Sequence, residues 1–175
     1  MTQTRAITLN ALSLYAVALV LAAAYAAQFI LQELPCPLCL LQRILFAALA
    51  VGPILNIRFG PRPSHYAMSL LAALAGAVAS TRQVLLHIMP GDAGYGSALL
   101  GFIAAIVLLA AILLFDRQFE EDKAVLPATG GAFAQTAVWL VIALTAINVV
   151  TTLLECGFGA CADDPVMYEL LKRGG

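Results

Sequence analysis

Five long apolar runs, separated by short polar segments, dominate the pattern of hydrophobic and polar positions along the chain. A bilayer core of about 30 Å requires about 20 mainly apolar residues in each spanning helix. None of the runs alternates between apolar and polar residues as a barrel strand would. The pattern therefore predicts an all-α integral membrane protein, one transmembrane domain with spanning helices at residues 11–32, 40–57, 66–88, 98–115 and 134–154.

The composition supports this class and excludes others. Of the 175 residues, 62% are hydrophobic and only 11% are charged, and the net charge is −1. An average soluble domain is about half apolar and about one quarter charged. The near-zero net charge also provides no basic surface for nucleic acid. We therefore expect the chain to contact membrane lipid and proteins, and not nucleic acid.

Basic residues in the short connections predict the orientation of the bundle, because Lys and Arg favour the cytoplasmic side. They fall before the first run, between the second and third, and between the fourth and fifth. These residues are Arg5, Arg58, Arg62, Arg117 and Lys123. The N-terminus is therefore predicted to be cytoplasmic, and the tail at residues 155–175 lies on the outer face.

Four cysteines form two close pairs that are far apart in the sequence. Cys36 and Cys39 precede the second run, whereas Cys156 and Cys161 follow the fifth. Five crossings place both pairs on the same outer face. If that face is a bacterial periplasm, disulfides persist there.

The first pair, in Cys36-Pro37-Leu38-Cys39, has the spacing of a redox motif. Pro37 fits only before or within the first turn of a helix, so the helix is predicted to begin there. Cys39 then lies in the first turn, where the positive end of the helix dipole favours a thiolate. Arg43 follows four residues later on the same face. A charge at this depth is costly unless it reaches the headgroups, and we favour a role beside the thiol.

Further polar residues are expected at the same depth. Gln28 interrupts the first run near its outer end, and Gln83 and His87 share one face of the third run, with Arg82 beside them. Each alone is typical of a residue at the membrane interface. Together with Arg43, these residues predict a polar pocket beneath the outer surface.

The C-terminal segment carries the second pair and a short helix. Gly157 and Gly159 permit the tight loop that a Cys156–Cys161 disulfide requires. Beyond it, Asp163 or Asp164 followed by Pro165 predicts the start of a short amphipathic helix on the membrane surface.

The motif Cys36-Pro37-Leu38-Cys39, the dipeptide Gln42-Arg43, and Gln28 together make the sequence resemble the DsbB family. Arg82 and His87 at the end of the third run add to the likeness. Members are bacterial inner-membrane quinone reductases that reoxidise the periplasmic thioredoxin-fold oxidase DsbA. The resemblance implies a four-helix quinone-reductase-like core plus one helix, and ubiquinone or menaquinone as the cofactor.

The resemblance also implies roles for individual residues. Cys36 and Cys39 are similar to the redox pair next to the quinone, with Cys39 engaging the ring. Arg43 and His87 are similar to quinone-site residues, and we assign Gln28 and Arg82 to the same site. Family members usually have four spans, with the second cysteine pair between helices 3 and 4. Here residues 89–97 contain no cysteine, and the second pair follows a fifth span.

The leading prediction is a membrane thiol:quinone oxidoreductase. In it, a DsbA-like protein reduces Cys156/Cys161, this pair reduces Cys36/Cys39, and electrons pass to quinone. Three alternatives stay open: a metal-binding protein that uses the four thiols, a bundle whose cysteines only staple loops, and a vitamin K epoxide reductase-like enzyme. The Cys-x4-Cys spacing is a poor match to zinc sites, so no metal is assigned. The early position of the CxxC motif fits the vitamin K enzymes less well.

Overall fold

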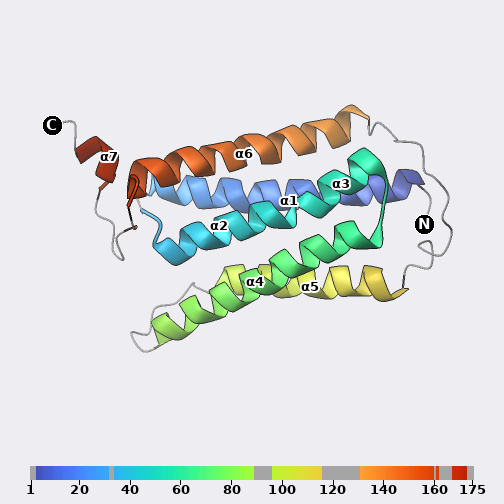
Figure 1. The fold of residues 1–175 in the computed structure, drawn as a ribbon, viewed down its shortest axis with the longest axis horizontal. Coiled ribbons are helices and arrows are strands. Elements are labelled where there is room, and N and C mark those ends of the chain that lie inside the picture. The colour runs from blue at the N-terminus through green and yellow to red at the C-terminus, as the bar shows by residue number, and fades with distance from the viewer. Residues whose placement is uncertain are drawn as a thin grey trace.

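The computed structural model describes residues 3–31, 34–88, 96–115, 131–159, 161 and 167–172, and this part of the chain contains helices and no strand. Figure 1 shows an elongated bundle whose long helices run along one axis. The helices are α1 (Gln3–Ile30), α2 (Pro37–Leu49), α3 (Val51–Phe59), α4 (Pro63–Ile88), α5 (Gly96–Phe115), α6 (Ala132–Cys156) and α7 (Glu169–Lys172).

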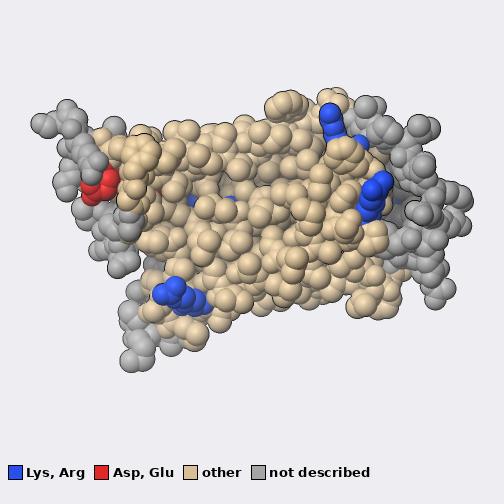
Figure 2. All heavy atoms as spheres, in the orientation of Figure 1, with Lys and Arg blue, Asp and Glu red and all other residues tan. Residues whose placement is uncertain are grey.

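The described part of the chain contains five candidate membrane spans, as predicted. The helices α1, α4, α5 and α6 are each long and apolar enough to span a membrane, and α2 and α3 together form the remaining span, Pro37–Phe59. In Figure 2 the Lys and Arg side chains gather at the two ends of the body, while the band between them is almost entirely uncharged. Many large apolar side chains point outward along this band, as lipid contact requires.

The second span is broken between α2 and α3 because Pro53 has no N–H to donate to the carbonyl of Leu49. Ser69 of α4 forms hydrogen bonds with backbone groups at this break. Its hydroxyl donates to the Leu49 carbonyl (2.8 Å) and accepts from the N–H of Gly52 (3.2 Å). A Cβ on Gly52 would collide with Ser69 Oγ and the carbonyl of His65. The kink is therefore a docking point for α4.

Helix packing forms a continuous apolar core. α1 packs against α6 and α3, whereas α4 packs against α5, α2 and α3. The rings of Phe46 and Phe102 stack at the centre with centroids 4.1 Å apart. Gly76 of α4 makes room for Phe102, since a Cβ at that position would overlap its ring. A small residue thus sets how closely α4 and α5 approach.

A buried polar network joins α1, α3 and α4 near the end of the bundle where α3 ends. The Nδ2 of Asn56 donates to Asn10 Oδ1 (3.0 Å), and Asn10 Nδ2 donates to the hydroxyl of Tyr66 (3.2 Å). The Oδ1 of Asn56 accepts from the backbone N–H of Arg62 (3.2 Å) and lies 2.9 Å from His65 Nδ1. Because these side chains are paired, we regard the network as structural.

Within the described residues, the C-terminal helix is shorter than the sequence predicted. Asp163, Asp164 and Pro165, the predicted helix start, lie outside the described residues. Met167 and Tyr168 are not helical, and α7 begins at Glu169. The hydroxyl of Tyr168 accepts a hydrogen bond from Gln28 Nε2 (3.1 Å), and α7 packs against α6. These contacts hold Tyr168 and α7 against the helix bundle.

Candidate functional site

Both cysteine pairs lie at the same end of the bundle, the end where α2 begins and α6 ends (Figure 1). We call it the cysteine end. This placement agrees with the prediction from five crossings. Cys36 and Cys39 are free thiols, whereas Cys156 and Cys161 are joined by a disulfide.

The first pair forms the N-terminus of α2, as Pro37 predicted. Cys36 is the N-cap in extended conformation, and its sulfur accepts a hydrogen bond from the N–H of Cys39 at 3.2 Å. The hydrogen bond between the two cysteine side chains and burial together raise the pKa of the Cys36 thiol. Cys36 therefore holds its proton, and the helix N-terminus favours a negative charge on the neighbouring sulfur of Cys39.

A pair of glutamines supports both sulfurs. The Nε2 of Gln83 in α4 donates to Cys39 Sγ at 3.2 Å and reaches Cys36 Sγ at 3.5 Å. Gln42 of α2 donates through Nε2 to Gln83 Oε1 at 2.5 Å, which orients the Gln83 amide with its N–H groups toward the thiols. The sequence indicated that Gln83 would lie on a polar face, but it gave no sign that both sulfurs share its amide.

Arg43 is buried, with 7% of its side chain exposed, and α1 holds its guanidinium. Nη1 donates to Gln28 Oε1 at 2.5 Å, and Nη2 donates to the carbonyl of Ala24 at 3.0 Å. The guanidinium also lies 5.1 Å from the centroid of the Tyr25 ring and interacts electrostatically with Cys39. The structure thus brings together Arg43, Gln28 and the thiol, as expected from their common depth.

A cavity of about 990 Å³ opens beside these groups. Its polar lining includes both thiols of the first pair, Gln42, Arg43 and His87, and its apolar walls come from α1, α2 and α5. His87 donates through Nδ1 to the carbonyl of Gln83 at 2.8 Å, so its ring is held at the cavity edge.

Arg82 is not brought to this cavity. Its side chain is exposed and lines a separate, mainly apolar groove on the exposed side of α4, with Val78, Thr81 and Leu85. Successive residues on a helix point about 100° apart, because 3.6 residues make one turn. With Gln83 turned toward the thiols, Arg82 points away from them.

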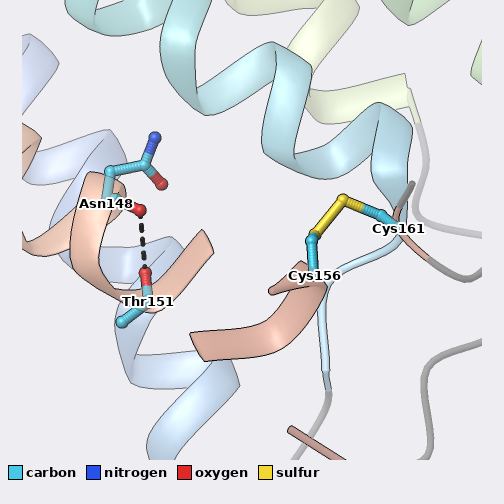
Figure 3. The surroundings of a disulfide bond; sticks show 4 residues. All are labelled: Asn148, Thr151, Cys156 and Cys161. Atoms are coloured by element: carbon cyan, nitrogen blue, oxygen red, sulfur yellow. Dashed lines mark hydrogen bonds between the residues drawn. A yellow bond between two sulfur atoms is a disulfide. The ribbon is translucent and has the colours of Figure 1, made fainter. Parts of the chain in front are cut away.

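The second pair closes a short loop at the end of α6. Cys156 lies in the last turn of the helix, and Cys161 folds back to it with 4.4 Å between the two Cα atoms (Figure 3). Gly157 adopts a φ of +63°, which only glycine takes without strain. Between the cysteines, Phe158 is 92% exposed. α6 packs against α2, the helix that begins at the first pair.

The described side chains form no cluster of three or more His, Cys, Asp or Glu residues that could hold a metal ion. Glu155, in the last turn of α6, was not assigned a role from the sequence. In the structure its side chain is buried, and Arg43 and Cys39 of α2 interact with its carboxyl electrostatically. Its place one residue before Cys156 can be read from the sequence, but its interaction with residues of α2 cannot.

Comparison with known proteins agrees with this geometry. Residues 5–151 match the family described as "Disulfide bond formation protein DsbB". That range contains Cys36, Cys39 and Arg43 and ends before Cys156 and Cys161. No solved structure matches the chain.

Curated relatives share a shorter segment. Over 63 residues the chain is 43% identical to Disulfide bond formation protein B of Xanthomonas axonopodis pv. citri (strain 306), and this segment is 33% of the chain and 37% of that relative. Disulfide bond formation protein B of Xanthomonas oryzae pv. oryzae (strain MAFF 311018) is 41% identical over the same length and the same shares. The match therefore spans about a third of each relative. The family match covers most of the chain, and the protein belongs to the DsbB family, with its second cysteine pair in a C-terminal tail.

Proposed function

We propose that the protein is a membrane thiol:quinone oxidoreductase that supports disulfide bond formation. In this proposal a periplasmic DsbA-like protein passes two electrons to Cys156/Cys161, which pass them to Cys36/Cys39 and then to a membrane quinone. The observation that carries it is the Cys36/Cys39 dithiol opening into a cavity of about 990 Å³ that also holds a buried arginine.

The residues of this cavity fit a quinone. Its apolar walls suit a ring and a lipid-like tail, and Phe46 supplies an aromatic surface. Arg43, Gln42 and His87 would hold the ring oxygens through their N–H groups. When bound, ubiquinone or menaquinone would supply an acceptor for two electrons and two protons.

The chain's own residues prepare the dithiol for oxidation. The start of α2 and the amide of Gln83 stabilise negative charge on Cys39, and Arg43 adds a positive charge nearby. Cys36 retains its proton because its pKa is raised by the hydrogen bond with Cys39 and by burial. Cys39 is therefore the sulfur that would react with the acceptor, the role that the family resemblance implies.

The second pair is proposed to receive electrons from the soluble partner. Cys156 is buried, whereas Cys161 is partly exposed, so a partner thiolate reaches Cys161 more easily. Attack would form a mixed disulfide at Cys161 and release Cys156 as a thiolate, and a second partner thiol would then release Cys161. The exposed phenyl ring of Phe158 offers an apolar contact beside this bond.

The orientation in the membrane is part of the proposal. Arg58 and Arg62 lie where α3 leads into α4, at the end opposite the cysteine end. Because basic connections favour the cytoplasm, we place the cysteine end in the periplasm of a bacterial inner membrane and the N-terminus in the cytoplasm.

The test is quinone-dependent oxidation of a reduced DsbA-like partner by the purified protein in lipid. Replacement of Cys36 or Cys39 by Ser is expected to abolish turnover with both ubiquinone and menaquinone. Thr81→Val, on the exposed side of α4, serves as the control and should retain activity. Undiminished turnover in either cysteine variant would refute the proposal.

A further inference from the structure

Glu155 is a buried acid that the proposed electron path does not use. It lies in the last turn of α6, one residue before Cys156, and only 3% of its side chain is exposed. Within the described part of the chain, neither of its carboxyl oxygens has a hydrogen-bond partner. Buried polar atoms are rarely left unpaired, because removing them from water without a hydrogen bond is costly. A function would explain why this carboxyl is kept.

Its surroundings contain the redox thiol. α6 packs against α1, α2 and α7, and from α2 both Arg43 and Cys39 interact electrostatically with the Glu155 carboxyl. Arg43 in turn interacts with Tyr25 of α1 and with Tyr168, which precedes α7. Arg43 therefore interacts with both the Cys39 thiol and the Glu155 carboxyl, and ionisation of either acid opposes ionisation of the other.

Glu155 is not simply the bonded counter-ion of Arg43. The guanidinium donates through Nη1 to Gln28 and through Nη2 to the carbonyl of Ala24. On α6 itself, the hydroxyl of Thr151, one turn earlier, is directed to the carbonyls of Ile147 and Asn148, and Figure 3 shows the latter bond. The carboxyl oxygens of Glu155 are thus left available to accept a proton.

We propose that Glu155 and Cys39 share one proton, and that Glu155 acts as the proton-transfer group of the Cys36/Cys39 dithiol. This inference rests on the proposed redox cycle. Two titrating groups that interact electrostatically lose their protons as a coupled pair, and Arg43 balances the single negative charge that remains.

The electrons and protons balance over one cycle. Oxidation of the Cys156/Cys161 dithiol to its disulfide releases two electrons and two protons, which reduce the Cys36–Cys39 disulfide. One proton goes to Cys36, and the other is held jointly by the Cys39 thiolate and the Glu155 carboxylate. Both protons leave with the two electrons when the first pair is oxidised by the quinone, and Glu155 is again a carboxylate.

The first test measures the reactivity of Cys39 without any partner or quinone. In a Cys36→Ser background with the Cys156–Cys161 disulfide intact, the rate of iodoacetamide alkylation is followed against pH. With Glu155 present we expect a two-step profile. Glu155→Gln should give a single step with its midpoint about one pH unit lower, about tenfold more thiolate at a given pH. The control Glu169→Gln, in the half-buried first turn of α7, should leave the profile unchanged. Identical profiles with and without the Glu155 substitution would overturn the proposal.

A second test needs no substitution at Glu155, so it can be performed even if the Glu155→Gln protein does not fold. Alkylation of Cys39 in the Cys36→Ser protein removes the thiolate that competes for the shared proton. Infrared difference spectra at neutral pH should then show loss of a carboxylic-acid C=O band as Glu155 ionises. An unchanged carboxyl region would overturn the proposal.

The rate of turnover shows whether Glu155 transfers a proton or only changes the charge around Cys39. With all four cysteines present, Glu155→Gln should slow electron transfer to added quinone about 10²-fold, the usual contribution of a general acid or base. A shifted alkylation profile with unchanged turnover would overturn the proton-transfer role. If the Cys36→Ser protein shows the two-step alkylation profile, but the protein with all four cysteines passes electrons to neither ubiquinone nor menaquinone, the proposed function fails and the shared proton stands.

Discussion

Replacing Gln83 by Leu tests whether its amide sets the redox potential of the first cysteine pair. Gln83 Nε2 donates to Cys39 Sγ at 3.2 Å and reaches Cys36 Sγ at 3.5 Å. A hydrogen bond to a charged group contributes about 1.5–3 kcal/mol. The reduced pair, which carries the thiolate, gains this stabilisation and the disulfide does not. The midpoint potential of Gln83→Leu should therefore fall by about 30–60 mV, since about 30 mV corresponds to 1.4 kcal/mol for two electrons.

The same substitution has a separate effect on stability. It leaves the buried Nε2 of Gln42 without its acceptor, at a cost of about 1–3 kcal/mol in the free energy of unfolding. Adding Gln42→Leu removes that unpaired donor. The double variant should thus recover stability while its potential stays low, which separates the two effects.

The assay is equilibration of the Cys36/Cys39 pair in lipid against dithiothreitol buffers of known potential, with thiols quantified by alkylation and mass spectrometry. Thr81→Val, whose hydroxyl bonds only within α4 among the described contacts, should keep the wild-type potential. A wild-type potential in the Gln83→Leu variant would refute the role of this amide.

Two further predictions concern packing and the order of thiol reactivity. Gly76→Ala should destabilise the bundle by about 1–3 kcal/mol because the new Cβ overlaps the Phe102 ring, and thermal unfolding in lipid measures this. Gly96→Ala, which meets no atom within 4 Å, is the control, and equal unfolding temperatures for both variants would contradict the overlap. Because the pKa of Cys36 is raised, this residue stays protonated as pH rises through neutrality, so limiting iodoacetamide should label Cys39 first. Mass spectrometry identifies the labelled residue, and preferential labelling of Cys36 would contradict the expected order.

The crossing number and the common face of the cysteine pairs follow from local properties of the chain. The apolar length of each run decides whether it spans a bilayer, and an odd number of spans brings residues before the second and after the last to one face. The start of α2 at Pro37 is also local, because proline fits only the first turn of a helix. The depth of Arg43 follows from its distance along that helix.

Tertiary structure decided which polar groups meet. The hydropathy pattern predicts the depth of a residue along its helix but not the rotation of the helix about its axis. That rotation is set by packing between helices, as at Gly76 and Phe102. Rotation of α4 turns Gln83 toward both sulfurs and the adjacent Arg82 outward.

The same reasoning applies to the acids and bases around Cys39. Arg43 is held by Gln28, fifteen residues away on α1, and Glu155, near the far end of the chain, interacts electrostatically with both Arg43 and Cys39. By itself, the sequence determined five membrane spans, a helix N-terminus at the first dithiol and two thiol pairs on one face. Only the packed bundle decided which side chains surround Cys39, because those contacts join helices that are distant in sequence.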